Sequence, residues 1–319
     1  MIGGRGKWDP RGKHCYVTGG SSGLGLALAL LLARKGANVS IVARNKKSLK
    51  EALAQLEAAR VNKSQIFNSY SFALDAFSTT EDAFNAACEP YGGRSPDAVF
   101  LCAGKATPGF YIEQDEESIR RGMDSTFWVA SWSAFVASRH MVRHRQVGKI
   151  VFVSSVLGYM SMLGYSTYAP GKHAIRGLAE GLRQELLLYS IDVHLYFPAT
   201  IFSPGYVEEN KTKPKLLLEL EATDDGLSPE KCAEGLFKGL QRGDFHITDT
   251  FICDAFRTNT RGSTPHGSQG LRDACIKLIG LIALPLWRRG VDKSVIAHRQ
   301  EHSDYLSAKQ FFVSGDRVE

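Results

Sequence analysis

Short apolar runs alternate with longer amphipathic stretches from residue 13 to about residue 199. The short runs are rich in β-branched and aromatic residues and are bounded by turn residues, which is typical of strands. They predict strands at 14–17, 39–43, 66–73, 98–102, 149–154 and 192–197. The amphipathic stretches predict helices at 23–35, 46–59, 79–91, 115–145, 165–189 and 229–241. Strict alternation implies right-handed βαβ crossovers, and therefore a doubly wound parallel sheet of the Rossmann type.

The C-terminal part follows a different pattern, which sets the expected domain organisation. We expect a catalytic domain over 1–250 that includes a lid at 203–228, and then a helical, membrane-associating extension over 251–319. Within the extension, 276–287 is apolar except for Lys277. A helix of that length measures about 18 Å, against a hydrocarbon core of about 30 Å, so it is too short to span a bilayer.

The residues that follow this apolar stretch suggest how it is used. It ends in Trp287, and Arg288 and Arg289 follow. An apolar helix edged by tryptophan and arginine is suited to lie in one leaflet on the anionic cytosolic side of a membrane. The alternative is a helix buried against the domain or in a subunit interface.

Composition excludes several other classes. The net charge of +6 comes from scattered basic residues, which gives no sign of a nucleic-acid partner. The six cysteines lack metal-like spacing, so we expect buried thiols in a reducing compartment and no metal site. The first residues contain no apolar run, so no signal peptide is expected and the catalytic part is predicted to face the cytosol.

A glycine-rich turn between the first strand and the first helix indicates a dinucleotide. Glycines at this place let the backbone approach a pyrophosphate, whose charge then lies at the helix N-terminus. An ordinary glycine-rich turn is the alternative, and the strand before it and the helix after it argue against that. The predicted contacts in this turn are Gly19, Ser21, Ser22, Gly23, Leu24 and Gly25.

The end of the second strand indicates which dinucleotide binds. Many NAD-binding proteins place a carboxylate there for the ribose hydroxyls, whereas this chain has Ala43 followed by Arg44. A guanidinium can bind a 2′-phosphate through two hydrogen bonds, so we predict NADPH. Lys47 adds a second positive charge or is simply an exposed helix residue. Asp75 is placed to accept from the adenine amine, and the small Ala103–Gly104 pair leaves room for the adenosine ribose.

Tyr168 and Lys172 lie four positions apart, with Ser155 thirteen positions before the tyrosine. On a helix this spacing puts a phenol and an ammonium on one face, where both can contact one ligand. A neighbouring cation favours the phenolate; lowering the tyrosine pKa from about 10 to about 7 requires about 4 kcal/mol. Such a pair also occurs by chance on exposed helices, so its significance depends on the glycine turn. Together the three side chains can deliver a proton to a carbonyl oxygen.

These motifs, in this order, resemble the short-chain dehydrogenase/reductase family over roughly 12–245. The resemblance implies that Tyr168 is the general acid, that Lys172 lowers its pKa and binds the nicotinamide ribose, and that Ser155 binds the substrate carbonyl. It also implies that Thr200, Ile201 and Ser203 lie near the nicotinamide. Two positions depart from the family pattern, because Cys102 and Thr126 stand where asparagines are usual. The second asparagine supports a water-linked proton relay, so we expect a slower relay here.

The segment 204–214 is similar to that of the 3-ketodihydrosphingosine reductases, which use NADPH. The resemblance implies a long-chain keto-lipid substrate in sphingolipid biosynthesis, the cytosolic face of the endoplasmic reticulum membrane, and a dimer or tetramer that pairs through 115–145 and 165–189. The run 215–220 is then a lid over the alkyl chain, or a loop helix packed on the core. Two alternatives remain: a hydroxysteroid or retinoid reductase, against which 204–214 argues, and a catalytically silent NADP-binding scaffold, against which the intact Ser155, Tyr168 and Lys172 argue.

Overall fold

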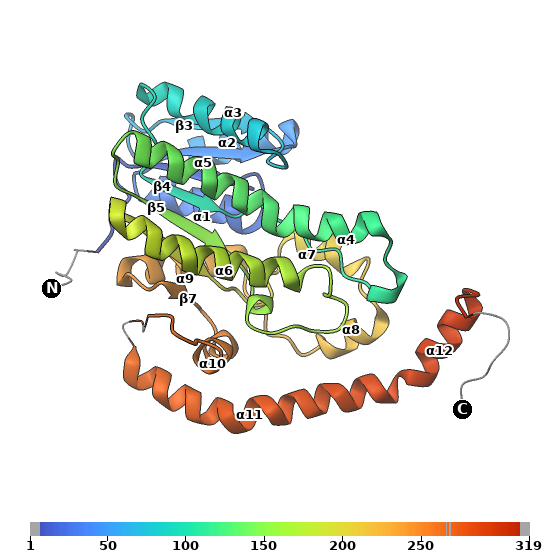
Figure 1. Cartoon of the computed structure of the whole chain (residues 1–319). Coiled ribbons are helices and arrows are strands. Elements are labelled where there is room, and N and C mark those ends of the chain that lie inside the picture. Colours follow the sequence, from blue (N-terminus) through green and yellow to red (C-terminus); the bar gives the residue numbers. More distant parts are fainter. Residues whose placement is uncertain (1–6, 266, 268, 313–319) are drawn as a thin grey trace.

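Seven parallel strands form the central sheet of the computed structural model, which describes residues 7–312 except 266 and 268 (Figure 1). In spatial order they are β3 (Phe67–Ser71), β2 (Asn38–Ala43), β1 (His14–Thr18), β4 (Ala98–Leu101), β5 (Gly148–Val153), β6 (Ile191–Tyr196) and β7 (His246–Ile247). The order reverses between β1 and β4, which confirms the predicted doubly wound fold. The sequence did not predict β7, because two residues are too few to show a period.

Helices cover both faces of the sheet and close two hydrophobic cores. Alternate strand residues point to opposite faces, so Val17 belongs to one core and Tyr16 to the other. The first core lies under α1 (Gly23–Arg34), α2 (Lys46–Ala58) and α9 (Pro229–Arg242). The second lies under α3 (Phe77–Cys88), α5 (Val129–Arg143) and α6 (Ala169–Leu186).

Two of the predicted helices differ from the observed ones next to the site. The stretch predicted as one helix over 115–145 consists of α4 (Glu116–Met123), a π-helical segment over Asp124–Trp128, and then α5. The helix predicted from 165 begins only at Ala169, with Pro170 in its first turn. Proline has no N–H to donate and is favoured in the first turn of a helix, so the helix begins here and Tyr168 becomes its N-cap.

The lid and the extension are helical and lie along one side of the domain (Figure 1). The lid contains α7 (Pro204–Asn210) and α8 (Lys215–Leu220). The extension contains α10 (Phe251–Asn259), α11 (Gly270–Ala297) and α12 (Arg299–Ala308). The predicted bounds 276–287 are therefore wrong, since this apolar stretch is the middle of a 28-residue helix.

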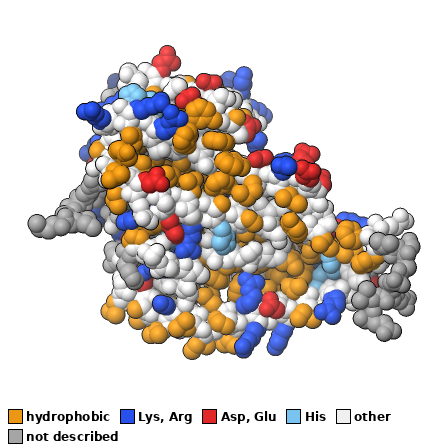
Figure 2. All heavy atoms as spheres, in the orientation of Figure 1, with side chains coloured by type: hydrophobic (Ala, Val, Ile, Leu, Met, Phe, Trp, Pro, Cys, Tyr) orange, Lys and Arg blue, Asp and Glu red, His pale blue; other side chains and the backbone are white. Residues whose placement is uncertain are grey.

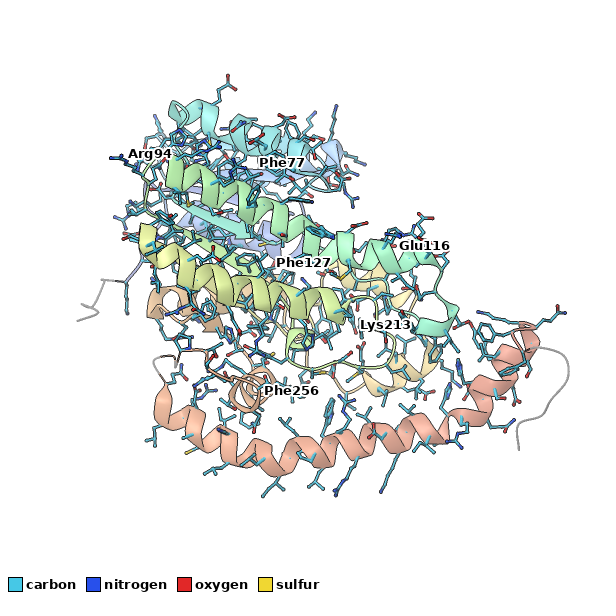
Figure 3. All side chains as sticks on the ribbon, viewed as in Figure 1. Phe77, Arg94, Glu116, Phe127, Lys213 and Phe256 are labelled. Atoms are coloured by element: carbon cyan, nitrogen blue, oxygen red, sulfur yellow. The ribbon has the colours of Figure 1, made fainter. Side chains whose placement is uncertain are left out.

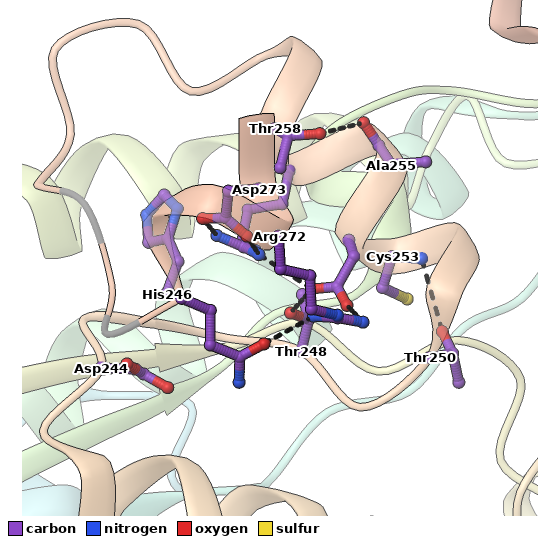
Figure 4. Close-up of polar contacts among 12 residues, drawn as sticks. Asp244, His246, Thr248, Thr250, Cys253, Ala255, Thr258, Arg272 and Asp273 are labelled. Carbon is purple, nitrogen blue, oxygen red and sulfur yellow. Dashed lines mark hydrogen bonds and ion pairs between the residues drawn. The ribbon is translucent and has the colours of Figure 1, made fainter. Parts of the chain in front are cut away.

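Buried charges anchor α11 to α10, in a set of residues that we call the anchor cluster: Asp254, Arg257, Arg261, Arg272 and Asp273 (Figure 4). Arg257 donates to both oxygens of Asp273, at 2.8 and 2.6 Å, and to Asp254 at 2.9 Å. Arg261 also pairs with Asp273. If α11 separated from α10, these buried charges would lose their partners. An uncompensated buried charge is costly, so the docked arrangement is strongly favoured.

One side of α11 packs on the domain and the other is open. Ile276 and Val291 are buried, whereas Leu278, Leu281 and Ile282 are 67%, 59% and 70% exposed. The same exposed side carries Cys275, so the expectation that all six cysteines are buried is wrong for this one. Within the described residues, no helix combines the length and the apolarity that crossing a bilayer requires.

Candidate active site

The three predicted catalytic residues meet at the carboxyl end of β5 and the start of α6. The Lys172 amide donates to the Tyr168 carbonyl at 3.2 Å, and the lysine Nζ lies 5.4 Å from the centre of the tyrosine ring. Ser155 follows β5, and its Oγ accepts from the Leu157 amide at 3.2 Å. The Ser155 and Tyr168 side chains are hydrogen-bonded to each other. The sequence therefore predicted a set of residues that the fold brings together.

Lys172 is a buried cation at the centre of this site. Its side chain is held by a hydrogen bond from Nζ to the Val153 carbonyl, at 3.0 Å. A side chain at Gly104 would begin only 3.7 Å from Nζ, so this glycine leaves space beside the ammonium. Burial disfavours the charged form and lowers the pKa of Lys172 to about 8. The lysine thus remains mostly charged at neutral pH.

The electrostatics of Tyr168 differ from the sequence prediction. Loss of contact with water raises the pKa of its phenol, the negative charge of Glu209 raises it further, and the hydrogen bond with Ser155 acts in the opposite direction. The expectation that Lys172 makes this pKa low is therefore wrong for the protein groups alone, because desolvation is the larger effect. The phenol holds its proton at neutral pH, which suits a proton donor.

Thr126 lies in the π-helical segment and is buried. Its hydroxyl donates to the Gly122 carbonyl at 2.6 Å. A Cβ on Gly171, in α6, would overlap that hydroxyl, so the two segments pack in direct contact there. π-Helical turns are often found at functional sites, and the sequence pattern of a regular helix did not reveal this one. The weaker proton relay predicted from Thr126 stays a prediction.

The glycine turn has the shape of a phosphate cradle. Gly19 has a φ of +67°, and a Cβ there would lie 3.0 Å from the Ala103 backbone. A Cβ on Gly25 would overlap the Gly19 carbonyl. Ser22 is the N-cap of α1 but makes no side-chain cap hydrogen bond, so the first amides of the helix face the turn without a side-chain partner. The geometry fits the pyrophosphate of a nicotinamide dinucleotide.

The remaining predicted cofactor contacts surround this turn. Ser203 approaches it, since a Cβ on Gly23 would lie 3.4 Å from the Ser203 Cβ. Leu24 is buried in the core, which leaves only its backbone for a ligand. Ile201 forms a β-bridge with Leu227, and Thr200 donates from Oγ1 to Asp224 at 3.1 Å. Both contacts hold the segment against the lid.

The outer end of the cofactor site is exposed. Arg44 follows β2, and the Ser71 hydroxyl donates to its carbonyl at 3.0 Å. Among the described residues its guanidinium has no ion pair with a carboxylate, which leaves it available for an anion. Lys47 and Asp75 are also exposed, and Ser21 is half-buried in the glycine turn. The contacts of these four side chains with a cofactor stay predictions.

Sequence reasoning missed a buried polar group beside the candidate catalytic residues, which we call the lid cluster: Tyr165, Glu209, Lys213 and Glu221. Lys213 is fully buried, and its Nζ lies 2.6 Å from Glu221 and 3.4 Å from Glu209. It lies in the lid, at the position labelled in Figure 3. The signal in the sequence was the charged run of 208–213.

The apolar run of the lid packs inward. Leu216 and Leu217 are buried, and Leu217 joins a small core with Leu157, Tyr165 and Ala169. A Cβ on Gly164 would lie 2.8 Å from Leu217, so the glycine permits this contact. Leu218 is 42% exposed. The structure thus shows 215–220 as a helix packed on this core, and its role as a lid over an alkyl chain stays a prediction.

The fold, the glycine turn and the Ser–Tyr–Lys set together define the short-chain dehydrogenase family. The family described as short chain dehydrogenase matches residues 13–214, and the chain belongs to it. Among curated relatives, 3-ketodihydrosphingosine reductase TSC10 of Cryptococcus neoformans is 39% identical over 307 residues, which cover 96% of this chain and 91% of the relative. The 3-dehydrosphinganine reductase of Danio rerio is 33% identical and covers 80% of this chain and 76% of its own.

Solved structures share the fold at lower identity. A short-chain dehydrogenase from Sphingobium yanoikuyae, in complex with NADPH, superposes with a TM-score of 0.64 at 21% identity, over 74% of this chain and 87% of its own. A short-chain dehydrogenase/reductase from Burkholderia phymatum, in complex with NAD, gives 0.69 at 20% identity, over 80% and 93%. These likenesses support the architecture described above.

Proposed function

We propose that this protein reduces 3-ketodihydrosphingosine to dihydrosphingosine with NADPH. The observation that carries the proposal is the assembled Ser155, Tyr168 and Lys172 under a lid that contains the 204–214 motif, in a chain whose curated relatives are named for this reaction. A bound NADPH supplies the hydride for the ketone carbon. Tyr168 donates its proton to the ketone oxygen, Ser155 positions that oxygen, and the charge of Lys172 stabilises the phenolate that remains.

The preference for NADPH rests on Arg44. A 2′-phosphate placed beyond β2 meets this exposed guanidinium and no carboxylate from the end of the strand. Replacing Arg44 with alanine is expected to raise the Kd for NADPH about tenfold, the equivalent of about 1.4 kcal/mol, and to leave the Kd for NADH nearly unchanged. Equal losses for both cofactors would show that Arg44 does not bind the 2′-phosphate.

The direct test is NADPH oxidation with 3-ketodihydrosphingosine, compared with a steroid ketone. We expect turnover of the long-chain ketone only, because the 204–214 segment argues against a steroid reductase. In the same assay Tyr168→Phe should lower kcat by at least about a hundredfold, the usual contribution of a general acid, with NADPH binding retained. Undiminished turnover in this variant would reject Tyr168 as the proton donor.

We further propose that α11 lies on the cytosolic face of the endoplasmic reticulum membrane. Hydrophobic and basic side chains are interspersed along the edge where α11 runs (Figure 2). Exposed leucines and isoleucines there match the acyl region of a leaflet, and Arg288 and Arg289 match anionic headgroups. A long-chain substrate dissolved in that leaflet would then lie next to the enzyme.

Contacts of α12 support this arrangement, because they link the extension to the entrance of the site. Lys215 of α8 pairs with Glu301 at 2.7 Å, and Glu113 pairs with Lys309 at 2.7 Å. The rings of Phe110 and His302 are in tilted contact, with centroids 4.1 Å apart. The helices that would contact lipid therefore border the lid under which the ketone is reduced.

Vesicle sedimentation tests the membrane proposal. Replacing Leu278, Leu281 and Ile282 together with serine removes exposed apolar area without touching the buried side of α11. Loss of sedimentation with anionic phosphatidylserine-containing vesicles, with the thermal unfolding temperature retained, is the expected result. Unchanged sedimentation would refute the membrane role of α11.

We also propose pairing of two copies through α4, α5 and α6. Trp128 and Phe135 are 39% and 43% exposed on this face, next to the partly buried Phe127 and Trp132. Exposed aromatic groups of this kind are enriched at interfaces. Sedimentation velocity of Phe135→Glu should show monomer where the parent chain shows a dimer or larger species, and a monomeric parent chain would reject the proposal.

A further inference from the structure

The lid cluster carries more negative than positive charge. It contains two carboxylates, Glu209 and Glu221, and one ammonium, Lys213. The side chains are 19%, 12% and 0% exposed respectively, so water screens them little. Burying an uncompensated carboxylate is costly unless a proton or a cation accompanies it. The cluster is therefore short of one positive charge.

The positions of the donors point the same way. The Tyr165 hydroxyl lies 2.6 Å from a Glu209 oxygen and 2.9 Å from a Glu221 oxygen. A hydroxyl has one hydrogen, so it can satisfy only one of these two acceptors fully. Lys213 is close to Glu221 and more distant from Glu209, so Glu209 is the less neutralised carboxylate. The Glu209 carboxylate can therefore accept from a further positively charged donor.

The deficit lies next to the catalytic tyrosine. The rings of Tyr165 and Tyr168 have centroids 5.9 Å apart, and Tyr165 contacts Glu209 through its hydroxyl. The negative charge of Glu209 extends to Tyr168, where it raises the pKa of the phenol. Asn210, the neighbour of Glu209 on α7, has a buried Oδ1 that lacks a hydrogen-bond partner among the described residues. The charge of Glu209 at Tyr168 favours a positively charged donor near the ketone.

We propose that Glu209 is the specificity residue of this reductase and binds an ammonium group on the carbon next to the ketone. This inference rests on the proposed function, whose substrate is a 2-amino-3-ketone. An ammonium has three N–H donors and one positive charge, and so supplies what the lid cluster lacks. With the ammonium on Glu209 and the ketone oxygen on Tyr168 and Ser155, two adjacent substrate carbons are fixed. A neutral ketone, such as a steroid, leaves the carboxylate uncompensated and binds less well.

Substitution of Glu209 by glutamine tests the charge while keeping an oxygen for Tyr165. The readout is kcat/KM for two long-chain ketones that differ only in the 2-amino group. Glu209→Gln is expected to lower the ratio of the amino-ketone value to the deamino-ketone value by at least about tenfold, as for a charge pair shielded from water. Any effect of the lost charge on Tyr168 acts on both ketones and does not alter this ratio. Glu208→Gln is the matched control, since Glu208 is exposed on the same helix and pairs with Lys211 at 2.6 Å; both ketones should react as in the parent chain.

The possible outcomes distinguish a failure of this inference from a failure of the proposed function. Equal losses for both ketones, or no loss for either, would overturn the ammonium site. If the parent chain reduces neither ketone, the proposed function fails instead. Should Glu209→Gln not fold, the parent chain still decides: inhibition by a long-chain 2-amino-1,3-diol is expected to be at least about tenfold tighter than by the corresponding 1,3-diol without the amine. Equal inhibition by the two compounds would overturn the proposal.

Discussion

Two buried charge clusters of this protein use the same side-chain chemistry for different purposes. In the anchor cluster the buried Asp254 and Asp273 face the buried Arg257 and Arg261, and Arg272 adds a half-exposed contact. In the lid cluster two carboxylates share one lysine and one phenol. The first is supplied with cations and joins two helices, whereas the second lacks one cation and lies beside the catalytic tyrosine. We infer that the lid cluster, which is short of positive charge, serves to bind a ligand, whereas the anchor cluster serves to hold two helices together.

The largest expected effect comes from removing one carboxylate of the anchor cluster. Asp273→Ala leaves Arg257 and Arg261 buried without this partner, so the free energy of unfolding should fall by about 3–5 kcal/mol. Denaturant unfolding measures this change, with Arg272→Ala as the control, since that half-exposed pair is worth only about 1 kcal/mol. If both variants lose the same small amount, the anchor cluster does not hold α11.

A smaller and more local effect is expected from the lid cluster. Lys213→Met leaves Glu209 and Glu221 facing each other without a cation, which should destabilise the lid by about 2 kcal/mol and raise the rate of proteolysis within 204–221. Lys211→Met is the matched control, because Lys211 is exposed on the same segment. Limited proteolysis followed by mass spectrometry gives the cleavage sites. Cleavage within α11 instead would contradict the separation of the two clusters.

The smallest expected effect is the loss of stability of the anchor cluster in acid. Hydrogen bonds and charges of Arg257 and Arg261 lower the pKa of Asp273, although burial opposes them. Its contribution to stability is therefore present above the pKa of the unfolded chain, near 3.8, and is lost as the pH falls through the lower folded pKa. At neutral and alkaline pH the anchor cluster should not change.

The catalytic site should respond at the other end of the pH scale. The pKa of Lys172 is about 8, so the ammonium that stabilises the phenolate is lost as the pH rises above this value. We expect kcat/KM for ketone reduction to fall about tenfold for each pH unit above 8. Stability should not fall in the same range, because the pKa of Lys172 is lower in the folded chain than its usual value of 10.5, so losing the proton there favours the folded state. A rate that is flat between pH 7 and pH 9.5 would show that this charge is not needed.

The dinucleotide part of the site could be predicted from local sequence. Gly19, Gly25 and the strand before them form one continuous segment, and their backbone requirements are visible in the spacing of the glycines. Ser155, Tyr168 and Lys172 are also close in sequence, so strand and helix periodicity alone placed them at the same edge of the sheet. Their electrostatics could not be predicted, because the pKa values of Tyr168 and Lys172 depend on burial by elements distant in the chain.

The lid cluster and the course of α11 could not be predicted for the same reason. Tyr165 and Glu221 are separated by α6, β6, α7 and α8, and their contact depends on how α8 packs on the small core around Leu217. α11 begins close to the ion pair between Asp273 and Arg257, six residues before the apolar stretch that suggested a helix in the sequence.

The sequence by itself determined six of the seven strands, most of the helices between them, the glycine turn and the three candidate catalytic side chains, because periodicity and short spacings express backbone geometry directly. Only the tertiary structure decided which charges are compensated. Whether a charge is compensated depends on which side chains surround it in three dimensions. Glu208 and Glu209 are adjacent in the chain, yet Glu208 is exposed beside Lys211, whereas Glu209 lies in the lid cluster near Tyr168.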